Sequence, residues 1–315
     1  MRPYEQLEQE LGDAVVCSSG TAALHLAFEA LQLPQGGEVI MSDFNMIACP
    51  RAATLAGLKP VFVDCDERLL IDPELVERAI NINTVAILAT HVYGRRCEMD
   101  TINRIATERN LAVVEDLAEA FGVEPHRSTD AACWSFYRNK IVAGEEGGAV
   151  RFLCKEATRI ARQLRSLGFT DAHDYCHIPR GHNYRLADCL AEKVLESLHN
   201  LKWSQHWRRF SEKCWDATIP TEWHMPTRDA VWVYDIRIPR LQNIDEVVAA
   251  LRTEGIEARH SFKPMCGQEE FKAAPRYHAH IASREVLYLP VSPDMKMVPY
   301  VRARKLIQSK CSPRN

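Results

Sequence analysis

The chain has 315 residues, 46% hydrophobic and 26% charged, which is an ordinary globular composition and enough length for a large domain plus a smaller one. Its formal net charge of -3 gives no broad electrostatic attraction for nucleic acid or an anionic membrane. Eleven cysteines without a C-x-x-C pair fit reduced thiols better than a disulfide framework, and the sequence shows neither a signal-peptide core nor a membrane-spanning run. We therefore expect a cytoplasmic enzyme without a metal site, nucleic-acid partner or membrane anchor.

The first predicted unit is a buried strand at 14–18, a turn at Ser19, Gly20 and Thr21, and a helix with apolar residues at helical spacing. The first amides of a helix and the positive end of its dipole suit a phosphate group. A plain N-cap explains the same residues equally simply. Neither G-x-G-x-x-G nor a P-loop motif occurs, which argues against the usual dinucleotide and nucleotide sites.

Strand and helix patterns then alternate along the chain. Strands are predicted at 38–41, 60–64, 85–90, 111–116, 133–136 and 149–153, and helices at 51–58, 73–80 and 100–110. Repeated units of this kind predict an α/β fold with a mostly parallel sheet between layers of helices. Ligands of such sheets bind at the carboxyl ends of the strands.

Two charged residues follow predicted strands. Asp116 ends one strand, with Glu119 three positions later, and it could pair with a cationic ring nitrogen or cap a following helix. Lys140 follows the strand that carries Ser135, in a glycine-rich loop, and could form a Schiff base, although most lysines are surface charges. A phosphate turn, an acid and a lysine together are the groups that hold pyridoxal 5'-phosphate (PLP).

The last third of the chain changes in composition and predicts a smaller α+β domain at 200–315, after a large cofactor-binding domain at 1–199. We expect strands at 231–238 and 256–262 around a helix at 244–254. Five tryptophans lie in this part, and filling a small core explains them better than substrate binding does.

Several motifs carry a more specific resemblance. In chain order they are S-S-G-T-A-A-L-H-L-A, P-V-F-V-D, H-V-Y-G, V-E-D-L-A-E-A, W-S-F-Y-R-N-K with its later E-G-G, G-H-N-Y-R, and L-Y-L-P-V-S-P-D-M. In sequence and spacing they resemble the DegT/DnrJ/EryC1/StrS family of fold-type-I PLP enzymes, best known as sugar aminotransferases. The resemblance implies that family's fold, its PLP cofactor and its smaller C-terminal domain.

The resemblance also implies roles for residues around the cofactor ring. Lys140 is implied to be the Schiff-base lysine and proton shuttle, and Asp116 the partner of the pyridinium nitrogen. Glu119 stands where the family has a side chain near the ring oxygen. Met46 stands where the family has an aromatic residue stacked on the ring, and a thioether can still pack on a ring face.

At the phosphate end, Gly20, Thr21 and Ser135 match phosphate-binding positions of the family. Asn183 matches an asparagine that reaches the phosphate of the neighbouring subunit. The resemblance therefore implies a homodimer with shared active sites.

The implied reaction moves an amino group from an amino acid, with glutamate or glutamine expected, to a keto group on a sugar, nucleotide-sugar or similar polar metabolite. Met46 and Glu145, the latter in place of a loop glycine, depart from the family near the substrate side, and the chain begins close to the phosphate turn. A PLP-dependent decarboxylase or lyase acting on an amino-acid-containing substrate is therefore an alternative. A non-catalytic protein on the same fold is a third possibility.

Overall fold

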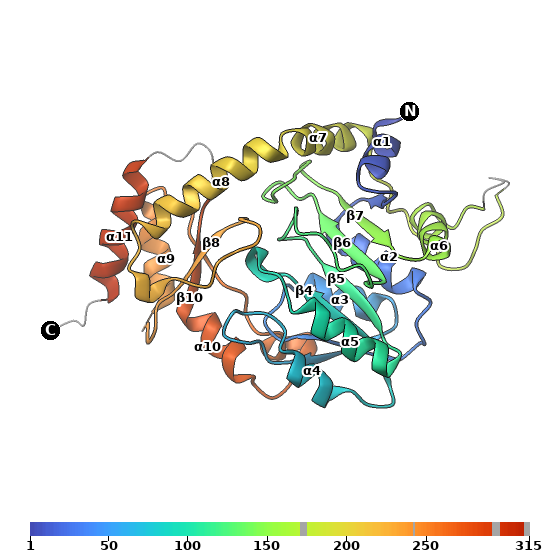
Figure 1. Ribbon diagram of the computed structural model, residues 1–315, viewed down its shortest axis with the longest axis horizontal. Helices are drawn as coiled ribbons and strands as arrows, with labels where there is room; N and C mark the ends of the chain where they lie inside the picture. Colours follow the sequence, from blue (N-terminus) through green and yellow to red (C-terminus); the bar gives the residue numbers. More distant parts are fainter. Residues whose placement is uncertain (171–174, 242, 292–296, 312–315) are drawn as a thin grey trace.

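The structure, a computed structural model, describes residues 1–170, 175–241, 243–291 and 297–311 (Figure 1). A seven-stranded sheet has the order β1-β7-β6-β5-β4-β2-β3, and β7 runs opposite to the other six strands. Its strands are β1 (Val15–Cys17), β2 (Glu38–Ser42), β3 (Lys59–Val63), β4 (Thr84–Thr90), β5 (Ala112–Asp116), β6 (Ala131–Ser135) and β7 (Gly148–Phe152). The predicted α/β class with a mostly parallel sheet is confirmed.

The register of this sheet brings the ends of its central strands together. Thr90 pairs with Asp116, which pairs with Cys133, so β4, β5 and β6 end at one edge of the sheet. The phosphate turn lies at the same edge, because Ser19 forms a bridge with Gly147 at the start of β7. Motifs that are separated in the sequence therefore lie together at one edge of the sheet.

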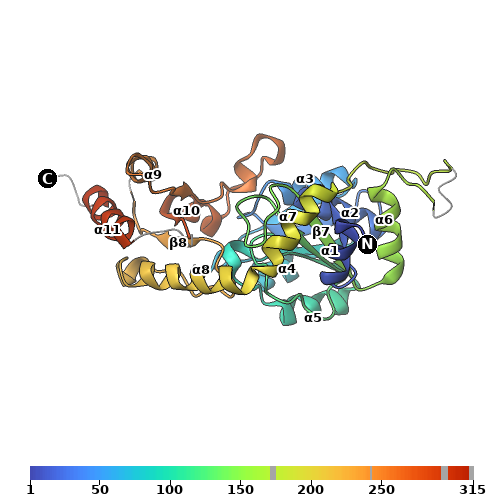
Figure 2. The same cartoon turned by 90° about the horizontal axis from the view of Figure 1, so that it is seen from above.

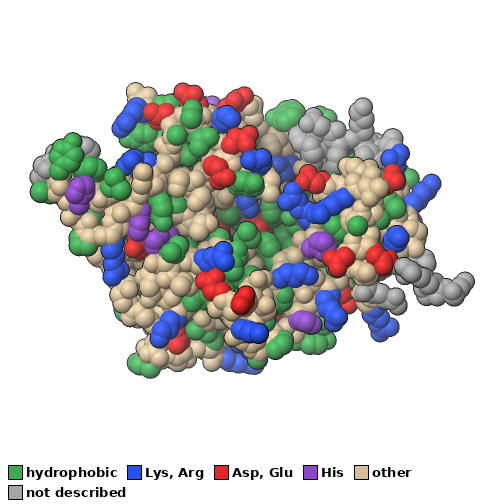
Figure 3. Space-filling model, turned by 180° about the vertical axis from the view of Figure 1, so that it is seen from behind, with side chains coloured by type: hydrophobic (Ala, Val, Ile, Leu, Met, Phe, Trp, Pro, Cys, Tyr) green, Lys and Arg blue, Asp and Glu red, His purple; other side chains and the backbone are tan. Residues whose placement is uncertain are grey.

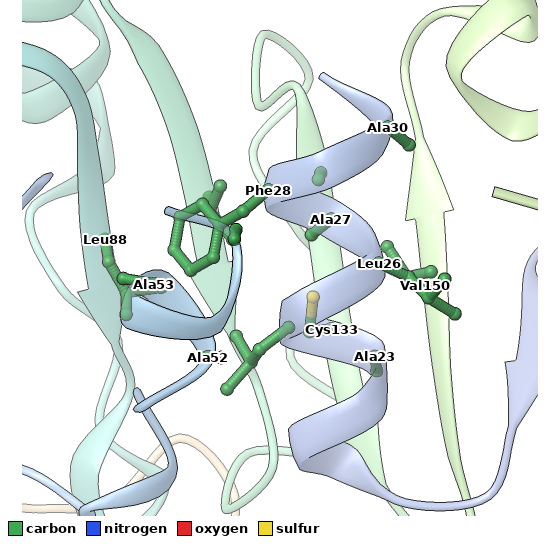
Figure 4. Packing of buried hydrophobic residues seen from close by; sticks show 14 of the residues in the cluster. Ala23, Leu26, Ala27, Phe28, Ala30, Ala52, Ala53, Leu88, Cys133 and Val150 are labelled. Atoms are coloured by element: carbon green, nitrogen blue, oxygen red, sulfur yellow. The ribbon is translucent and has the colours of Figure 1, made fainter. Parts of the chain in front are cut away.

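Helices cover both faces of the sheet (Figures 1 and 2). One face carries α2 (Gly20–Ala30), α3 (Ala48–Leu55) and α6 (Lys155–Arg165), and the other carries α4 (Pro73–Ala79), α5 (Met99–Arg109), α1 (Pro3–Glu10) and α7 (Asp188–His199). Figure 4 shows α2 between α3 and β7, with Phe28 on one side and Leu26 on the other. Small residues such as Ala23 and Ala27 let this helix approach the sheet closely.

The C-terminal part forms a second, antiparallel sheet of three strands in the order β8-β10-β9. Its elements are α8 (Leu201–Asp216), β8 (Tyr234–Arg237), α9 (Ile244–Thr253), β9 (Arg259–His260), α10 (Tyr277–Glu285), β10 (Val286–Leu289), α11 (Met297–Cys311) and the short helices η2 (Thr221–Trp223), η3 (Met265–Gly267) and η4 (Glu269–Phe271). Trp215 is fully buried in its core, as expected of a core-filling tryptophan, whereas Trp203 is 58% exposed and does not fill a core. Within the described ranges, no helix combines the length and hydrophobicity that crossing a membrane requires.

Several local predictions differ from the structure. The two strands predicted in the C-terminal part are shorter, because only β8 and the two-residue β9 pair with β10. Asp116 does not cap a helix, because residues 117–121 form turns and its Oδ1 accepts a hydrogen bond from the amide of Ala118 at 2.9 Å. The motif at 287–295 lies inside the described residues only as far as Val291.

A buried ion network joins the two sheets. Arg95, just after η1 (Val92–Gly94), donates to both oxygens of Asp235 on β8 at 2.8 and 2.9 Å, and Arg228 Nε donates to the same carboxylate at 2.9 Å. Burial opposes the charge, but the two guanidinium groups hold the pKa of Asp235 below its usual range. Beside this network, Gly94 accepts a hydrogen bond from the amide of Ala230 at 2.9 Å.

Removing the shared carboxylate should therefore destabilise the fold strongly. Asp235→Ala leaves the buried Arg95 without a carboxylate partner and leaves Arg228 with only Glu212 at 3.1 Å, and we expect it to lower the free energy of unfolding by about 3–5 kcal/mol. Glu74→Ala, which removes an exposed pair with Arg78, should cost less than about 1 kcal/mol and is the matched control. Urea denaturation measures both values, and equal losses would contradict the role given to the network.

Candidate active site

The loop that carries Lys140 is held by its own backbone. Phe136 donates to the carbonyl of Gly147 and accepts from the amide of Gly144, both at 2.8 Å, which closes the loop at its base. Within it, the amide of Lys140 donates to the carbonyl of Tyr137 at 2.8 Å. These bonds fix the lysine backbone at the edge of the sheet.

The side chain of Lys140 is nearly buried, with 14% of its surface exposed. Its Nζ lies 3.8 Å from Glu119 Oε1 and 4.1 Å from the ring centroid of Trp232. Trp232 is in turn fixed, because its indole N–H donates to the carbonyl of Asn139 at 2.7 Å. The amine is thus confined between a carboxylate and an aromatic face.

Glu119 lies in the same buried environment. Its Oε2 accepts a hydrogen bond from the amide of Tyr93 at 2.8 Å. Burial raises the pKa of Glu119 to about 7, against the opposing charge of Lys140 and with a smaller contribution from the nearby Asp116. At neutral pH this carboxyl group can therefore either accept or donate a proton.

Asp116 is buried at the end of β5, and both of its oxygens have partners. Oδ1 accepts from the amide of Ala118 and Oδ2 accepts from the thiol of Cys49 at 3.1 Å. Burial raises the pKa of Cys49 well above its usual range, so the thiol keeps its proton and remains a donor. Cys49 holds the carboxylate in place without neutralising its charge.

The predicted phosphate turn has the required shape. Ser19 caps α2 by accepting the amide of Ala22 at 3.1 Å, so α2 begins at Gly20 and Thr21. A Cβ on Gly20 would lie 2.7 Å from Cβ of Ser135, which brings the helix start against the end of β6. This glycine-dependent cradle presents helix amides beside a hydroxyl, as a phosphate requires.

These residues fit PLP. Gly20, Thr21 and Ser135 would hold its phosphate, Asp116 its ring nitrogen, and Lys140 its aldehyde carbon. The lysine and the acid lie at one sheet edge, and Glu119 lies 3.8 Å from the lysine amine.

Three other positions that the sequence singled out have different surroundings. Met46 is 48% exposed and lines a cavity of about 700 Å³ between the β2–α3 connection and residues 261–270. Asn183 is exposed beside a different cavity and contacts Ser166 through a bridge, so one chain does not bring it to Lys140. Glu145 has a φ of 72° where a glycine would fit without strain, and its exposed carboxylate lies 3.6 Å from Arg138.

Known proteins resemble this chain in sequence and in fold. Residues 6–302 match the DegT/DnrJ/EryC1/StrS aminotransferase family. The chain belongs to this family. Its enzymes use PLP, so the predictions of family, fold, cofactor and enzyme class are confirmed.

Curated and solved relatives agree with the assignment of this aminotransferase. A GDP-perosamine synthase of Caulobacter vibrioides is 32% identical over 272 residues, which cover 80% of the chain and 72% of the relative. A UDP-N-acetyl-3-dehydro-alpha-D-glucosamine 3-aminotransferase of Acidithiobacillus ferrooxidans is 32% identical, with 93% of the chain and 83% of the relative covered. The crystal structure of S. venezuelae DesV is 27% identical with a TM-score of 0.90, covering 100% of the chain and 91% of that structure.

Sequence reasoning missed two residues of the aminotransferase site. Trp232 carried a signal only as part of an alternating strand pattern, which says that one face is buried but not against what. Cys49 carried no signal, since a lone cysteine is most often a core residue. Both reach the site from segments distant in sequence from Lys140 and Asp116.

The raised pKa of Glu119 predicts a pH dependence of stability in the cofactor-free protein. Between its ordinary value of 4.5 and about 7, the folded state holds a proton that the unfolded state has released, so stability falls as pH rises through this window. We expect wild type to lose up to about 3 kcal/mol relative to Glu119→Gln across it. Urea titrations at several pH values test this. The difference in stability between wild type and Glu124→Gln, at an exposed site, should not change with pH. A difference between wild type and Glu119→Gln that stays the same at all pH values would contradict the prediction.

Proposed function

We propose that the protein transfers an amino group from glutamate or glutamine to a keto group of a nucleotide-linked sugar, with Lys140 as the Schiff-base lysine of PLP. The observation that carries this proposal is the confinement of Lys140 Nζ between Glu119 and Trp232 at the sheet edge where Asp116 ends β5. A lysine in such surroundings is suited to covalent catalysis rather than to solvation.

When bound, PLP supplies an electron-withdrawing ring that accepts the electrons of the bond broken at the donor's α-carbon. The residues of the chain control that ring and the protons. Asp116 would keep a proton on the ring nitrogen, since its carboxylate is fixed by Cys49 and Ala118. Lys140 would remove and return the proton at the substrate carbon, and Glu119 would exchange a proton with the ring oxygen.

The acceptor would enter the cavity of about 700 Å³ beside Met46. Phe262 lines this cavity and packs against Tyr93 with ring centroids 5.6 Å apart, and Tyr93 follows the strand end beside Glu119. Lys263 places a positive charge in the lining that could meet a phosphate of a nucleotide-linked sugar, whereas Arg51 already pairs with Glu270 at 3.1 Å. Figure 3 shows both basic and acidic side chains beside a hollow with hydrophobic side chains on its floor. Two relatives carry the names of nucleotide-sugar enzymes, which supports this substrate class.

We also propose a homodimer in which Asn183 of each chain completes the partner's phosphate site. Asn183 is exposed, and its neighbour Tyr184 accepts a hydrogen bond from the amide of Ser18 at 2.8 Å. The loop is thereby fixed next to the phosphate turn while the Asn183 side chain stays at the surface. A cytoplasmic location remains part of the proposal.

A decarboxylase or lyase gains no support from Glu145, one of the two departures that suggested it. Glu145 lies beside Arg138 at the surface rather than pointing at the amine of Lys140. A non-catalytic role has less support, because Lys140 lies beside Glu119 and the tight turn at Gly20 lies beside Ser135, as the proposed reaction would require.

The lysine should be required for amino transfer. With glutamate and a nucleotide-linked keto sugar, Lys140→Ala should lower the turnover rate at least about a hundredfold, because its proton transfers are lost. Lys193→Ala, at an exposed position on α7, should keep wild-type turnover. Formation of 2-oxoglutarate and of the amino sugar measures the reaction. Near-wild-type turnover by Lys140→Ala would contradict the assignment, and CO2 or ammonia release without an acceptor would favour the decarboxylase or lyase instead.

Shared sites predict complementation between two inactive variants. A mixed dimer of Lys140→Ala and Asn183→Ala chains keeps one intact site, with Lys140 from one chain and Asn183 from the other. Random exchange should make about half of the dimers mixed and so restore about a quarter of wild-type activity. Activity assays after mixing and subunit exchange test this, with each variant alone as the control. Full activity of Asn183→Ala, or no gain on mixing, would contradict a shared site.

A further inference from the structure

A second cluster of polar side chains lies behind the phosphate turn. His25 and Glu29 are one helical turn apart on α2, and the loop at 181–185 brings His182 to them. His182 Nε2 lies 2.6 Å from Glu29 Oε2, and His25 Nε2 lies 3.7 Å from Glu29 Oε1. The side chains of His25 and Glu29 are only 4% and 7% exposed, so this is an interior cluster.

His25 has an unused nitrogen aimed into this cluster. Its Nδ1 lies 3.1 Å from the hydroxyl of Tyr184, which orients the ring. Its Nε2 is buried and makes no hydrogen bond of normal geometry among the described residues. An imidazole oriented through one nitrogen, with the other nitrogen buried and without a hydrogen bond of normal geometry, offers that nitrogen to a metal ion.

We propose that His25, Glu29 and His182 bind a divalent transition-metal ion, best matched by zinc. Two imidazoles and a carboxylate are a common zinc ligand set, with a fourth position open to water. The three ligand atoms all lie within 4.8 Å of one another. Bonds of about 2.0–2.1 Å in a tetrahedral site would bring them to about 3.4 Å apart, which a small rotation of the half-buried His182 provides. Glu29 also lines an open cavity of about 410 Å³, which gives the ion a path from solvent.

The ion would act on the loop that carries Asn183. Asn183 lies between His182, a ligand, and Tyr184, which supports the ligand His25. The carbonyl of Tyr184 accepts the amide of Ser18, next to the phosphate turn. Metal binding would therefore fasten the loop to α2 and fix the backbone on both sides of Asn183. The binding itself does not depend on the proposed reaction.

Cobalt binding tests the site, because tetrahedral Co²⁺ has an intense visible spectrum and substitutes for zinc. The PLP-bound enzyme, stripped of metal with EDTA and freed of any tag, is titrated with CoCl2 and then with ZnCl2. Cysteine thiols can also bind Co²⁺, but every variant keeps the same cysteines, so their contribution to the spectrum is the same in all of them. His182→Gln, at a partly exposed position, removes one ligand. Tyr184→Phe removes only the hydroxyl that orients His25, and His199→Gln, in an exposed pair with Glu10, is the matched control.

We expect one tetrahedral Co²⁺ per chain, displaced by Zn²⁺, in wild type and in His199→Gln. His182→Gln should lose this spectrum, and Tyr184→Phe should bind at least about tenfold more weakly, as removal of a supporting hydrogen bond to a ligand does. Zinc should also raise the melting temperature of wild type but not of His182→Gln, and slow hydrogen exchange in the loop at 181–185. Absence of a stoichiometric spectrum in wild type, or an unchanged spectrum in His182→Gln, would overturn the proposal.

Discussion

The confinement of Lys140 between Glu119 and the ring of Trp232 is the contact on which the rest of the site depends. The amine lies there because a buried acidic side chain and an aromatic face replace much of its hydration. The carboxylate comes from the large sheet and the ring from the C-terminal part, so the lysine has this environment only when the two are docked. The buried pairing of Arg95 with Asp235 holds that docking.

The phosphate end depends on a different constraint, which is the absence of a side chain. Gly20 allows the first turn of α2 to lie against Ser135, and Gly148 approaches the carbonyl of Ser19 so closely that a Cβ would lie 2.3 Å from it. Three segments distant in sequence meet there through backbone contact. The phosphate of the cofactor would thus be held where these backbone segments pack tightly, and its aldehyde carbon by the loop that carries Lys140.

The sequence predicted those parts of the site that repeat local patterns. Asp116 and Lys140 each follow an apolar strand, and a parallel sheet necessarily brings strand ends to one edge. Contacts between distant segments could not be predicted in the same way. Nothing in the local pattern says that Cys49 would donate to Asp116 or that Trp232 would cover the lysine, because both depend on the register of packed elements. A helix cap, one of the two roles considered for Asp116, is absent for the same reason, since the residues after it form turns and no helix.

The hydrogen bond from the indole of Trp232 to the carbonyl of Asn139 also limits how this protein can be recombined with its relatives. A chimera that takes its C-terminal third from another enzyme keeps Lys140 but exchanges Trp232, whose ring lies against the lysine amine. Such a hybrid would need a donor at position 232 and the carboxylate at Asp235 to preserve the amine's surroundings, even though neither residue belongs to the segment that defines the cofactor site. The natural unit for exchange therefore extends across the predicted domain boundary rather than ending at it.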